Sequence, residues 1–150
     1  MGRSGVLIGE YYHSMDSKSR LIVPAKFRSE LGKSIVMTRG LEGCLFVFPE
    51  KEWQTVSEKL SSLPLMKKDA RQFMRMFIGG AMEVDIDKSG RFVIPNPLAK
   101  YAKLEKECVI VGMQNRLEIW SEENWATYSE ESFEKYEEIA EELIDFEIKL

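Results

Sequence analysis

Alternating apolar and polar residues mark a predicted strand near the start of each half of the chain. The two sets are Tyr11, His13 and Met15 with Tyr12 and Ser14 between them, and Met82, Val84 and Ile86 with Glu83 and Asp85 between them. A period of two is typical of a strand that buries one face. Each set is followed by a polar segment and a short apolar run, residues 21–23 or 92–94. The pattern predicts two β-hairpins whose tips are the polar segments.

Each of these apolar runs ends at a proline, Pro24 or Pro95, and a short predicted helical connector follows. Proline cannot donate to a β-ladder, so it ends the strand. A second predicted hairpin comes next in each half, because short apolar runs bounded by turn residues are typical of strands. The paired runs are residues 34–38 with 45–48 and residues 109–111 with 117–120.

Helical spacing replaces the strand pattern in the middle and at the end of the chain. The apolar residues that follow this spacing are Trp53, Val56, Leu60 and Leu63, then Phe73, Met74, Phe77 and Ile78, and finally Phe133, Tyr136, Ala140 and Leu143. Pro64 interrupts the middle helix, and Gly79 and Gly80 end it. An apolar stripe on a helix usually packs in the core, so we expect these stripes to be buried and assign them no cofactor.

The same pair of segments occurs twice. DSKSRLIVP begins at residue 16 and DKSGRFVIP at residue 87, while GLEGCLFVFPEKEW begins at residue 40 and GMQNRLEIWSEENW at residue 112. Such self-similarity indicates repeated structural units. We therefore expect an α+β protein of two equivalent units. The expected boundaries are residues 10–52 for the first unit, 53–80 for linking helices, 81–124 for the second unit and 125–150 for an acidic helical tail.

Composition limits the kind of protein. With 150 residues, 44% hydrophobic and 31% charged, the chain is typical of a soluble protein with a sizeable core. It has no run of about 20 apolar residues for a membrane helix and no signal-peptide pattern at its start, so we expect a cytoplasmic protein with no membrane partner. Cys44 and Cys108 are isolated, which gives no support to a disulfide framework or a zinc site.

The formal net charge of −4 conceals a segregation of charge along the chain. Residues 121–150 carry eleven acidic side chains and two lysines, whereas residues 1–120 carry 19 basic and 14 acidic side chains. A polyanion would therefore meet the positively charged body of the protein, with the acidic tail held elsewhere.

The predicted hairpin tips carry a surface that suits an anion. Asp16 and Asp87 are expected to accept hydrogen bonds from backbone amides of their own turns. The residues expected to protrude are Ser17, Lys18, Ser19 and Arg20 in the first tip and Lys88, Ser89, Gly90 and Arg91 in the second, where glycine permits a positive φ. Cations, hydroxyls and free amides together suit phosphates and base edges. Turns are also polar for structural reasons alone, and duplication preserves a turn whatever it binds.

Catalysis and metal binding have little support. The only histidine, His13, shares a strand face with Met15, which favours a packed side chain over a general base. The chain has no nucleophile elbow, Walker loop, dinucleotide-binding loop or zinc-protease motif. The acids Glu83, Asp85 and Asp87 fit a strand followed by a turn. We therefore expect no enzyme activity, cofactor, metal or small-molecule substrate.

The remaining basic residues have ordinary explanations. Lys26 and Arg28 lie on the connector after Pro24, where the second unit has Asn96 and residues 98–100. Lys67, Lys68, Arg71 and Arg75 line the polar side of the middle helix. A solvated face is the usual role of such residues, and we leave them out of the expected site.

The doubled DSKSR and DKSGR signatures, each followed by three apolar residues and a proline, resemble the MraZ family of bacterial transcriptional regulators. The GxxxxL-strand-W blocks and the helical tail extend the resemblance over residues 8–143. It implies two tandem SpoVT/AbrB-like units that interleave into a pseudo-two-fold swapped-hairpin β-barrel flanked by helices. It also implies a ring-shaped homo-oligomer at the nucleoid that binds short direct repeats in double-stranded DNA. Family members mostly repress their own promoter, which drives a division and cell-wall gene cluster.

The resemblance implies that the basic residues at four positions of this sequence, Lys18, Arg20, Lys88 and Arg91, contact DNA. The expected DNA-binding set is Lys18, Arg20, Lys88 and Arg91 with Ser17 and Ser19, and the expected turn-structuring set is Asp16, Asp87 and Gly90. Many family members have glycine where this chain has Ser19, so the first turn departs from the family pattern while keeping a small residue.

Two other classes of function stay open. AbrB-like proteins also occur as antitoxins that hold a toxin through an extension, and the helix from Phe133 to Leu143 could serve as that extension. Antitoxin tails are usually disordered alone, whereas this tail has a regular apolar stripe that its own oligomer could bury. An enzyme on a related barrel would need a catalytic constellation, and none is found in the sequence.

Overall fold

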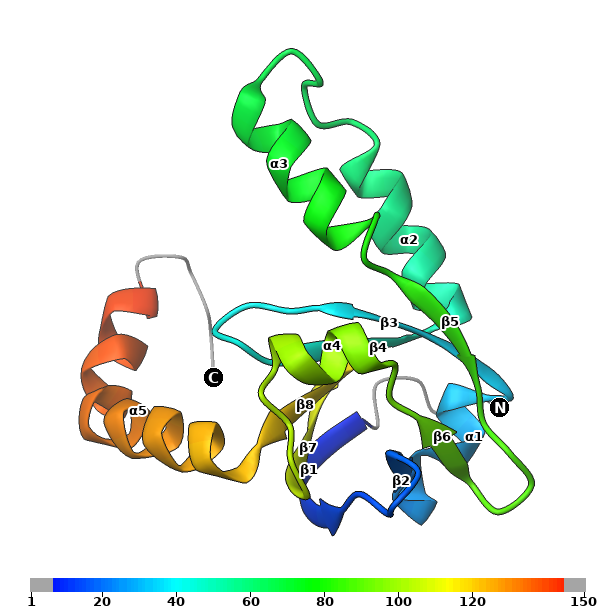
Figure 1. Ribbon diagram of the computed structural model, residues 1–150. Helices are drawn as coiled ribbons and strands as arrows, with labels where there is room; N and C mark the ends of the chain where they lie inside the picture. The colour runs from blue at the N-terminus through cyan, green and yellow to red at the C-terminus, as the bar shows by residue number, and fades with distance from the viewer. Residues whose placement is uncertain (1–6, 145–150) are drawn as a thin grey trace.

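The computed structural model describes residues 7–144 and has the expected α+β composition, with two antiparallel sheets and a long C-terminal helix (Figure 1). The strands are β1 (Leu7–Ser14), β2 (Arg20–Ile22), β3 (Ser34–Arg39), β4 (Leu45–Pro49), β5 (Met82–Asp85), β6 (Arg91–Val93), β7 (Glu107–Gln114) and β8 (Leu117–Ser121). The helices are η1 (Ala25–Phe27), α1 (Arg28–Leu31), α2 (Glu50–Leu60), α3 (Lys68–Phe77), α4 (Asn96–Tyr101) and α5 (Glu122–Leu143). Residues 145–150 of the expected tail lie outside the described residues.

The two halves share their sheets. The larger sheet has the order β1-β7-β8-β4-β3-β5, and the smaller one pairs β2 with β6. The first strand of each half therefore pairs with the other half, β1 with β7 and β5 with β3. Exchanging the halves leaves both orders unchanged, so the fold has a pseudo-two-fold relation that passes between β4 and β8.

The strands on either side of each tip separate instead of pairing as a hairpin. Asp16 and Arg20 are joined by one backbone hydrogen bond of 3.0 Å, from the amide of Asp16. Beyond that bond, β1 pairs with β7 and β2 pairs with β6. The prediction that residues 11–15 pair with residues 21–23 is therefore wrong. Local alternation specifies which face of a strand is buried, but it does not specify the partner strand.

The second hairpin of each half is confirmed, since β3 pairs with β4 and β7 pairs with β8. The middle helices are also confirmed, because α2 and α3 lie on either side of Pro64. The alternation in β1 is confirmed as well, with Tyr11 and His13 half-buried and Met15 buried.

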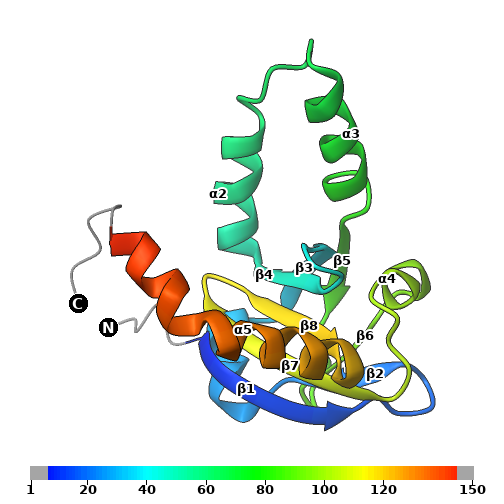
Figure 2. The same cartoon turned by 90° about the vertical axis from the view of Figure 1, so that its left-hand side faces the viewer.

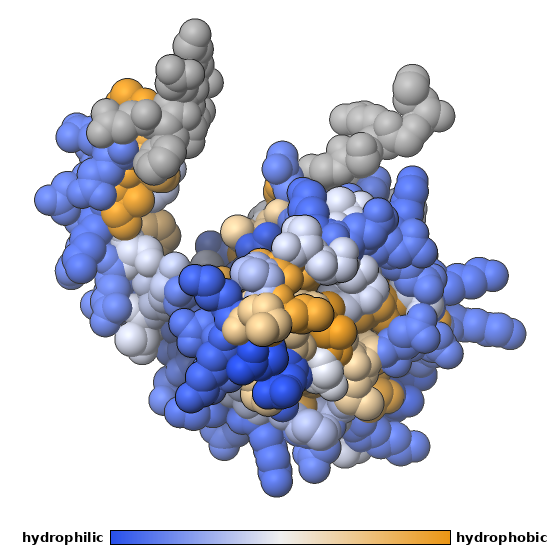
Figure 3. All heavy atoms as spheres, turned by 90° about the horizontal axis from the view of Figure 1, so that it is seen from above, coloured by the Kyte–Doolittle hydropathy of each residue, from blue (hydrophilic) through white to orange (hydrophobic). Residues whose placement is uncertain are grey.

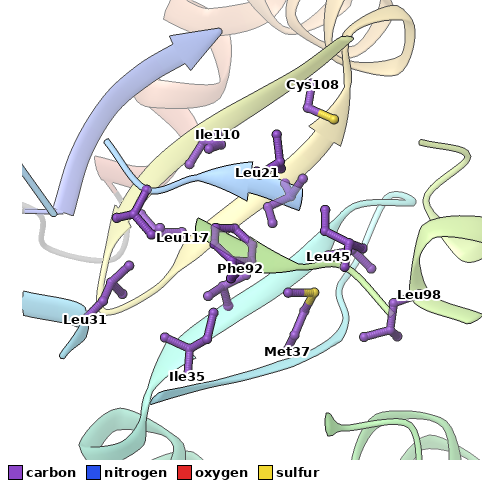
Figure 4. Close-up of a cluster of buried hydrophobic side chains, with 14 of the residues drawn as sticks. Leu21, Leu31, Ile35, Met37, Leu45, Phe92, Leu98, Cys108, Ile110 and Leu117 are labelled. Atoms are coloured by element: carbon purple, nitrogen blue, oxygen red, sulfur yellow. The ribbon is translucent and has the colours of Figure 1, made fainter. Parts of the chain in front are cut away.

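The larger sheet is covered on both faces. One face packs against the short β2–β6 ribbon, and Figure 4 shows Leu21 and Phe92 of that ribbon among residues of the larger sheet such as Ile35 and Ile110. The other face holds an aromatic cluster that includes Phe48, with α2, the end of α3 and the start of α5 packed around it. Burial on both faces explains why residues 45–48 and 109–111 are continuous apolar runs.

The long helices are the least buried parts of the fold. The hairpin of α2 and α3 stands away from the sheets (Figure 2), and Phe77 is its only buried residue within the helix bounds. Helix α5 has no buried residue, and Phe133 and Tyr136 are 73% and 68% exposed. The expectation that its stripe packs in the core is wrong for a single chain. Figure 3 shows apolar surface on this helix.

Helix α5 begins with a cap that its sequence supplies. The hydroxyl of Ser121 accepts a hydrogen bond of 3.1 Å from the amide of Asn124, and Glu122 and Glu123 place negative charge in the first turn. Both features stabilise a helix N-terminus. Among the helices of residues 7–144, none is both long and apolar enough to cross a bilayer.

Candidate nucleic-acid interface

The outer face of the β2–β6 ribbon alternates arginine with an exposed apolar residue. Arg20 lies opposite Val93, and Ile22 lies opposite Arg91, while Leu21 and Phe92 between them point into the core. Ile22 is 37% and Val93 is 48% exposed. Because side chains alternate along a strand, all four residues share one face of the ribbon.

The two short apolar runs are not buried along their whole length. Residues 21–23 and 92–94 are all apolar, but the middle residue of each run faces solvent. Sequence reasoning therefore missed Ile22 and Val93 as candidate contact residues. The signal was available, since a period of two that starts from the buried Leu21 places Ile22 on the opposite face.

Each tip is built around a carboxylate that bonds its own backbone and its own arginine. Asp16 Oδ1 accepts hydrogen bonds of 2.9 Å from the amides of Lys18 and Arg20, and Oδ2 accepts one of 2.7 Å from Arg20 Nε. The second tip repeats the arrangement, with 2.9 Å bonds from the amides of Ser89 and Arg91 and a 3.2 Å bond between Arg91 Nε and Asp87 Oδ2.

The carboxylate binds the Nε group of each arginine and leaves the two Nη groups available to donate hydrogen bonds to another partner. Arg20 and Arg91 donate through Nε, and their side chains stay 26% and 37% exposed. Among the described residues, none accepts a hydrogen bond from their Nη atoms. A guanidinium with two unbonded Nη groups can donate two parallel hydrogen bonds to one partner, which is the geometry that reads guanine.

The two tips lie at opposite ends of the ribbon, and they place their lysines differently. The shared aspartate and arginine align Ser17 with Lys88, Lys18 with Ser89, and Ser19 with Gly90. These last two residues both have a positive φ, of 58° and 83°. The ribbon brings Arg20 and Arg91 onto one face, whereas the antiparallel pairing keeps Lys18 and Lys88 at its two ends.

The hydrogen bonds in the tips set the direction of a pH effect. The backbone amide of Arg20 is the main cause that holds the pKa of Asp16 below its ordinary value of 3.8, and the amide of Arg91 does the same for the pKa of Asp87. The folded state therefore binds these protons less tightly than the unfolded state. The stability that the carboxylates contribute should be complete above pH 3.8 and lost as the pH falls through the lower, folded pKa.

A carbon-13 titration of the side-chain carboxyl groups tests this prediction. Asp16 and Asp87 should titrate with midpoints below 3.8. In an Arg20→Ala variant, the pKa of Asp16 should rise only part of the way, because the two backbone bonds remain. A midpoint at or above 3.8 in the unaltered protein would contradict the bonding that we describe.

The thiols do not belong to this surface. Cys44 and Cys108 are buried, and burial raises the pKa of both, that of Cys108 to about 11. Such thiols stay protonated near neutral pH and are poor nucleophiles. Within residues 7–144, no group of three or more histidine, cysteine or acidic side chains is placed to hold a metal ion.

A comparison with protein families gives two matches to one family model. The model is described as "MraZ protein, putative antitoxin-like", and it matches residues 6–76 and residues 77–147. Together the two matches cover nearly the whole chain, and each contains one of the two aspartate–arginine tips.

Proposed function

Because the chain belongs to the MraZ family of transcriptional regulators, we propose that it binds specific DNA sequences through the outer face of the β2–β6 ribbon. The observation that carries the proposal is the half-buried pair Arg20 and Arg91, each held at Nε by an aspartate. Regulation, and not enzyme catalysis, is the activity of the family.

In the proposed complex, the ribbon enters the major groove, which admits a two-stranded β-ribbon. The Nη groups of Arg20 and Arg91 donate to guanine, and each good bidentate pair contributes about 1–3 kcal/mol of discrimination. Ile22 and Val93 contact the methyl groups of thymine. Lys18 and Lys88, with Ser17 and Ser19, contact phosphates and position the ribbon.

The β2–β6 ribbon supports a finer description of the fold as a pseudo-two-fold swapped-hairpin barrel. Leu21 and Phe92 close one side of the larger sheet, and the interleaved strand order relates the two halves. We propose that this barrel is the rigid part that holds both tips in a fixed relation. A fixed relation matters because ordering the tips during binding would weaken the complex.

A ring-shaped homo-oligomer is the second part of the proposal. One protomer offers only two arginines to the base edges, which is too few for tight binding. A ring that sets copies of the ribbon along direct repeats makes every later contact intramolecular and raises the overall affinity. The exposed stripe on α5, with Phe133 and Tyr136, gives such an oligomer an apolar surface to bury.

The acidic helix starts on the side of the larger sheet away from the ribbon. Trp125 of α5 packs with the aromatic cluster, while Leu21 and Phe92 of the ribbon pack on the opposite face. This separation supports the proposal, because acidic side chains beside DNA phosphates would repel them.

By its resemblance to the family, we propose that the protein acts in the cytoplasm at the nucleoid. There it represses its own promoter and the division and cell-wall genes downstream. A direct test is a gel-shift titration with the upstream region of its own gene and a scrambled duplex, at two salt concentrations. We expect tighter binding to the repeat-bearing duplex, a steep loss with salt, and one ring stoichiometry by native mass spectrometry. Equal binding to both duplexes would contradict the proposal.

A second candidate function is a protein-binding module of antitoxin type. Its support is the same α5 stripe, where Phe133 and Tyr136 are among the most exposed large apolar residues. The gel-shift titration and native mass spectrometry described above distinguish this candidate from the DNA-binding regulator. A protein that remains monomeric, does not bind repeat-bearing DNA and is folded would favour the antitoxin-type module.

A further inference from the structure

A surface groove lies beside the second tip and gathers three basic residues. The groove has a volume of about 580 Å³ and is lined by Arg28, Lys33 and Lys88 together with Asp85 and Asp87. Arg28 begins α1, Lys33 precedes β3 and Lys88 lies in the tip, so three separate segments supply the cations (Figure 1). All three basic residues are exposed.

Arg28 is held against the second tip by the backbone of both halves. Its Nε donates a hydrogen bond of 3.4 Å to the carbonyl of Val23, and the amide of Val23 donates one of 2.7 Å to the carbonyl of Gly90. A Cβ placed on Gly90 would lie 2.5 Å from Arg28 Cζ and 2.7 Å from one Nη. The guanidinium therefore occupies the space that a side chain at position 90 would need.

The first tip lacks this arrangement. The position equivalent to Arg28 is Ala99, and the position equivalent to Gly90 is Ser19, which has a side chain. Ala99 is uncharged and packs against the core. The equivalent of Lys88 is Ser17, which is uncharged.

The third basic residue does have a counterpart, but in different surroundings. The amide of Ile86 bonds the carbonyl of Lys33, as the amide of Met15 bonds the carbonyl of Lys106. These bonds make Lys106 the equivalent of Lys33. Lys106 lies in another pocket, and the acids that line that pocket are Glu105, Glu107, Glu122 and Glu123.

The acids in the groove at the second tip leave it open to an anion. Asp87 already accepts three hydrogen bonds from its own turn and Arg91. Asp85 is thus the one acid lining the groove that has no such partners among the described residues, and it shares the groove with three basic residues. We propose that this groove binds a phosphate of the DNA backbone and that Arg28 is its central ligand. This inference rests on the proposed DNA-binding function.

The groove would also give the ribbon a direction on DNA. The outer face, with Arg20 opposite Val93 and Arg91 opposite Ile22, is nearly unchanged when the two halves are exchanged. Such a face alone binds in either orientation. A phosphate ligand at one end only makes one orientation more favourable, and copies that all bind in the same orientation read direct repeats.

A salt titration of binding to a repeat-bearing duplex and to a scrambled duplex tests the groove. Arg28→Ala should weaken binding to both duplexes by a similar factor and reduce the salt slope by about one unit per protomer bound. Arg28→Lys should restore most of the slope, because a lysine also binds phosphate. The control is Lys26→Ala, since Lys26 is exposed on the same connector but does not line the groove.

The outcomes separate this inference from the proposed function. If the unaltered protein binds no DNA, the proposed function fails. If Arg20→Ala loses binding while Arg28→Ala keeps the affinity and the salt slope, only the groove is overturned. A lower unfolding temperature in Arg28→Ala, with no recovery in Arg28→Lys, would also overturn it, because Arg28 would then act by supporting the fold.

Discussion

Replacing Arg20 by alanine should lower the affinity for the repeat-bearing duplex about 10- to 100-fold and should abolish most discrimination against a scrambled duplex. The physical reason is the loss of a guanidinium that Asp16 has already oriented, whose two Nη groups would read one guanine for about 1–3 kcal/mol. The measurement is fluorescence anisotropy on both duplexes, with unfolding followed in parallel.

Matched variants show whether the geometry of the Arg20 guanidinium or its charge alone is responsible for discrimination between the duplexes. Arg20→Lys keeps the charge but cannot donate two parallel hydrogen bonds, so it should recover non-specific affinity without recovering discrimination. Arg91→Ala should resemble Arg20→Ala, because both arginines lie on the same ribbon face. If Arg20→Ala discriminates between the duplexes as well as the unaltered protein does, the ribbon is not the reading surface.

Replacing Phe92 by alanine should destabilise the protein by about 3–5 kcal/mol, the usual effect of removing a large aromatic side chain from a packed core. Phe92 is 2% exposed and lies between the ribbon and the larger sheet (Figure 4). Urea unfolding followed by circular dichroism measures the change in the free energy of unfolding.

The neighbouring residue provides the control for Phe92. Val93 is on the outer face of the same strand, so Val93→Ala should change the free energy of unfolding by less than about 0.5 kcal/mol, as surface substitutions usually do. It should nevertheless weaken the preference for the repeat-bearing duplex. Equal destabilisation by the two substitutions would contradict the orientation of β6.

Much of the local structure follows from the sequence. The repeated DSKSR and DKSGR segments predict two turns, and proline, glycine and the spacing of apolar residues predict most strands and helices. The pairing of β1 with β7 does not follow. A strand with one buried face could bury that face equally well beside β2 or beside β7. Only the packing of both halves together decides between these two partners.

The sequence predicts part of the geometry of the candidate site. Arg20 and Arg91 are singled out by the motif, but the use of Nε by the aspartates depends on the turn geometry. The position of Arg28 beside the second tip is harder to predict from the sequence, because a basic residue on a short connector ordinarily faces solvent. The difference between Ser19 and Gly90 is visible in the sequence, yet only the structure shows that Arg28 fills the space at Gly90.

The stripe on α5 shows the limit of a periodic pattern. Apolar residues at helical spacing predict a face that avoids water, but they do not say whether the same chain covers it. Phe133 and Tyr136 are exposed in the single chain, so the pattern identified an exposed apolar face and not a part of the core.

The exchange of first strands between the halves has a consequence for synthesis. Leu7 pairs with Gln114, and Ser14 pairs with Glu107, so β1 has no partner until the second half of the chain has left the ribosome. Contacts so far apart in the chain slow folding. During synthesis, β1 therefore stays unpaired until β7 is made, and another nascent copy could pair with it. Two copies that exchange this strand would form an intertwined dimer, so pairing of β1 with β7 within one chain competes with pairing between copies.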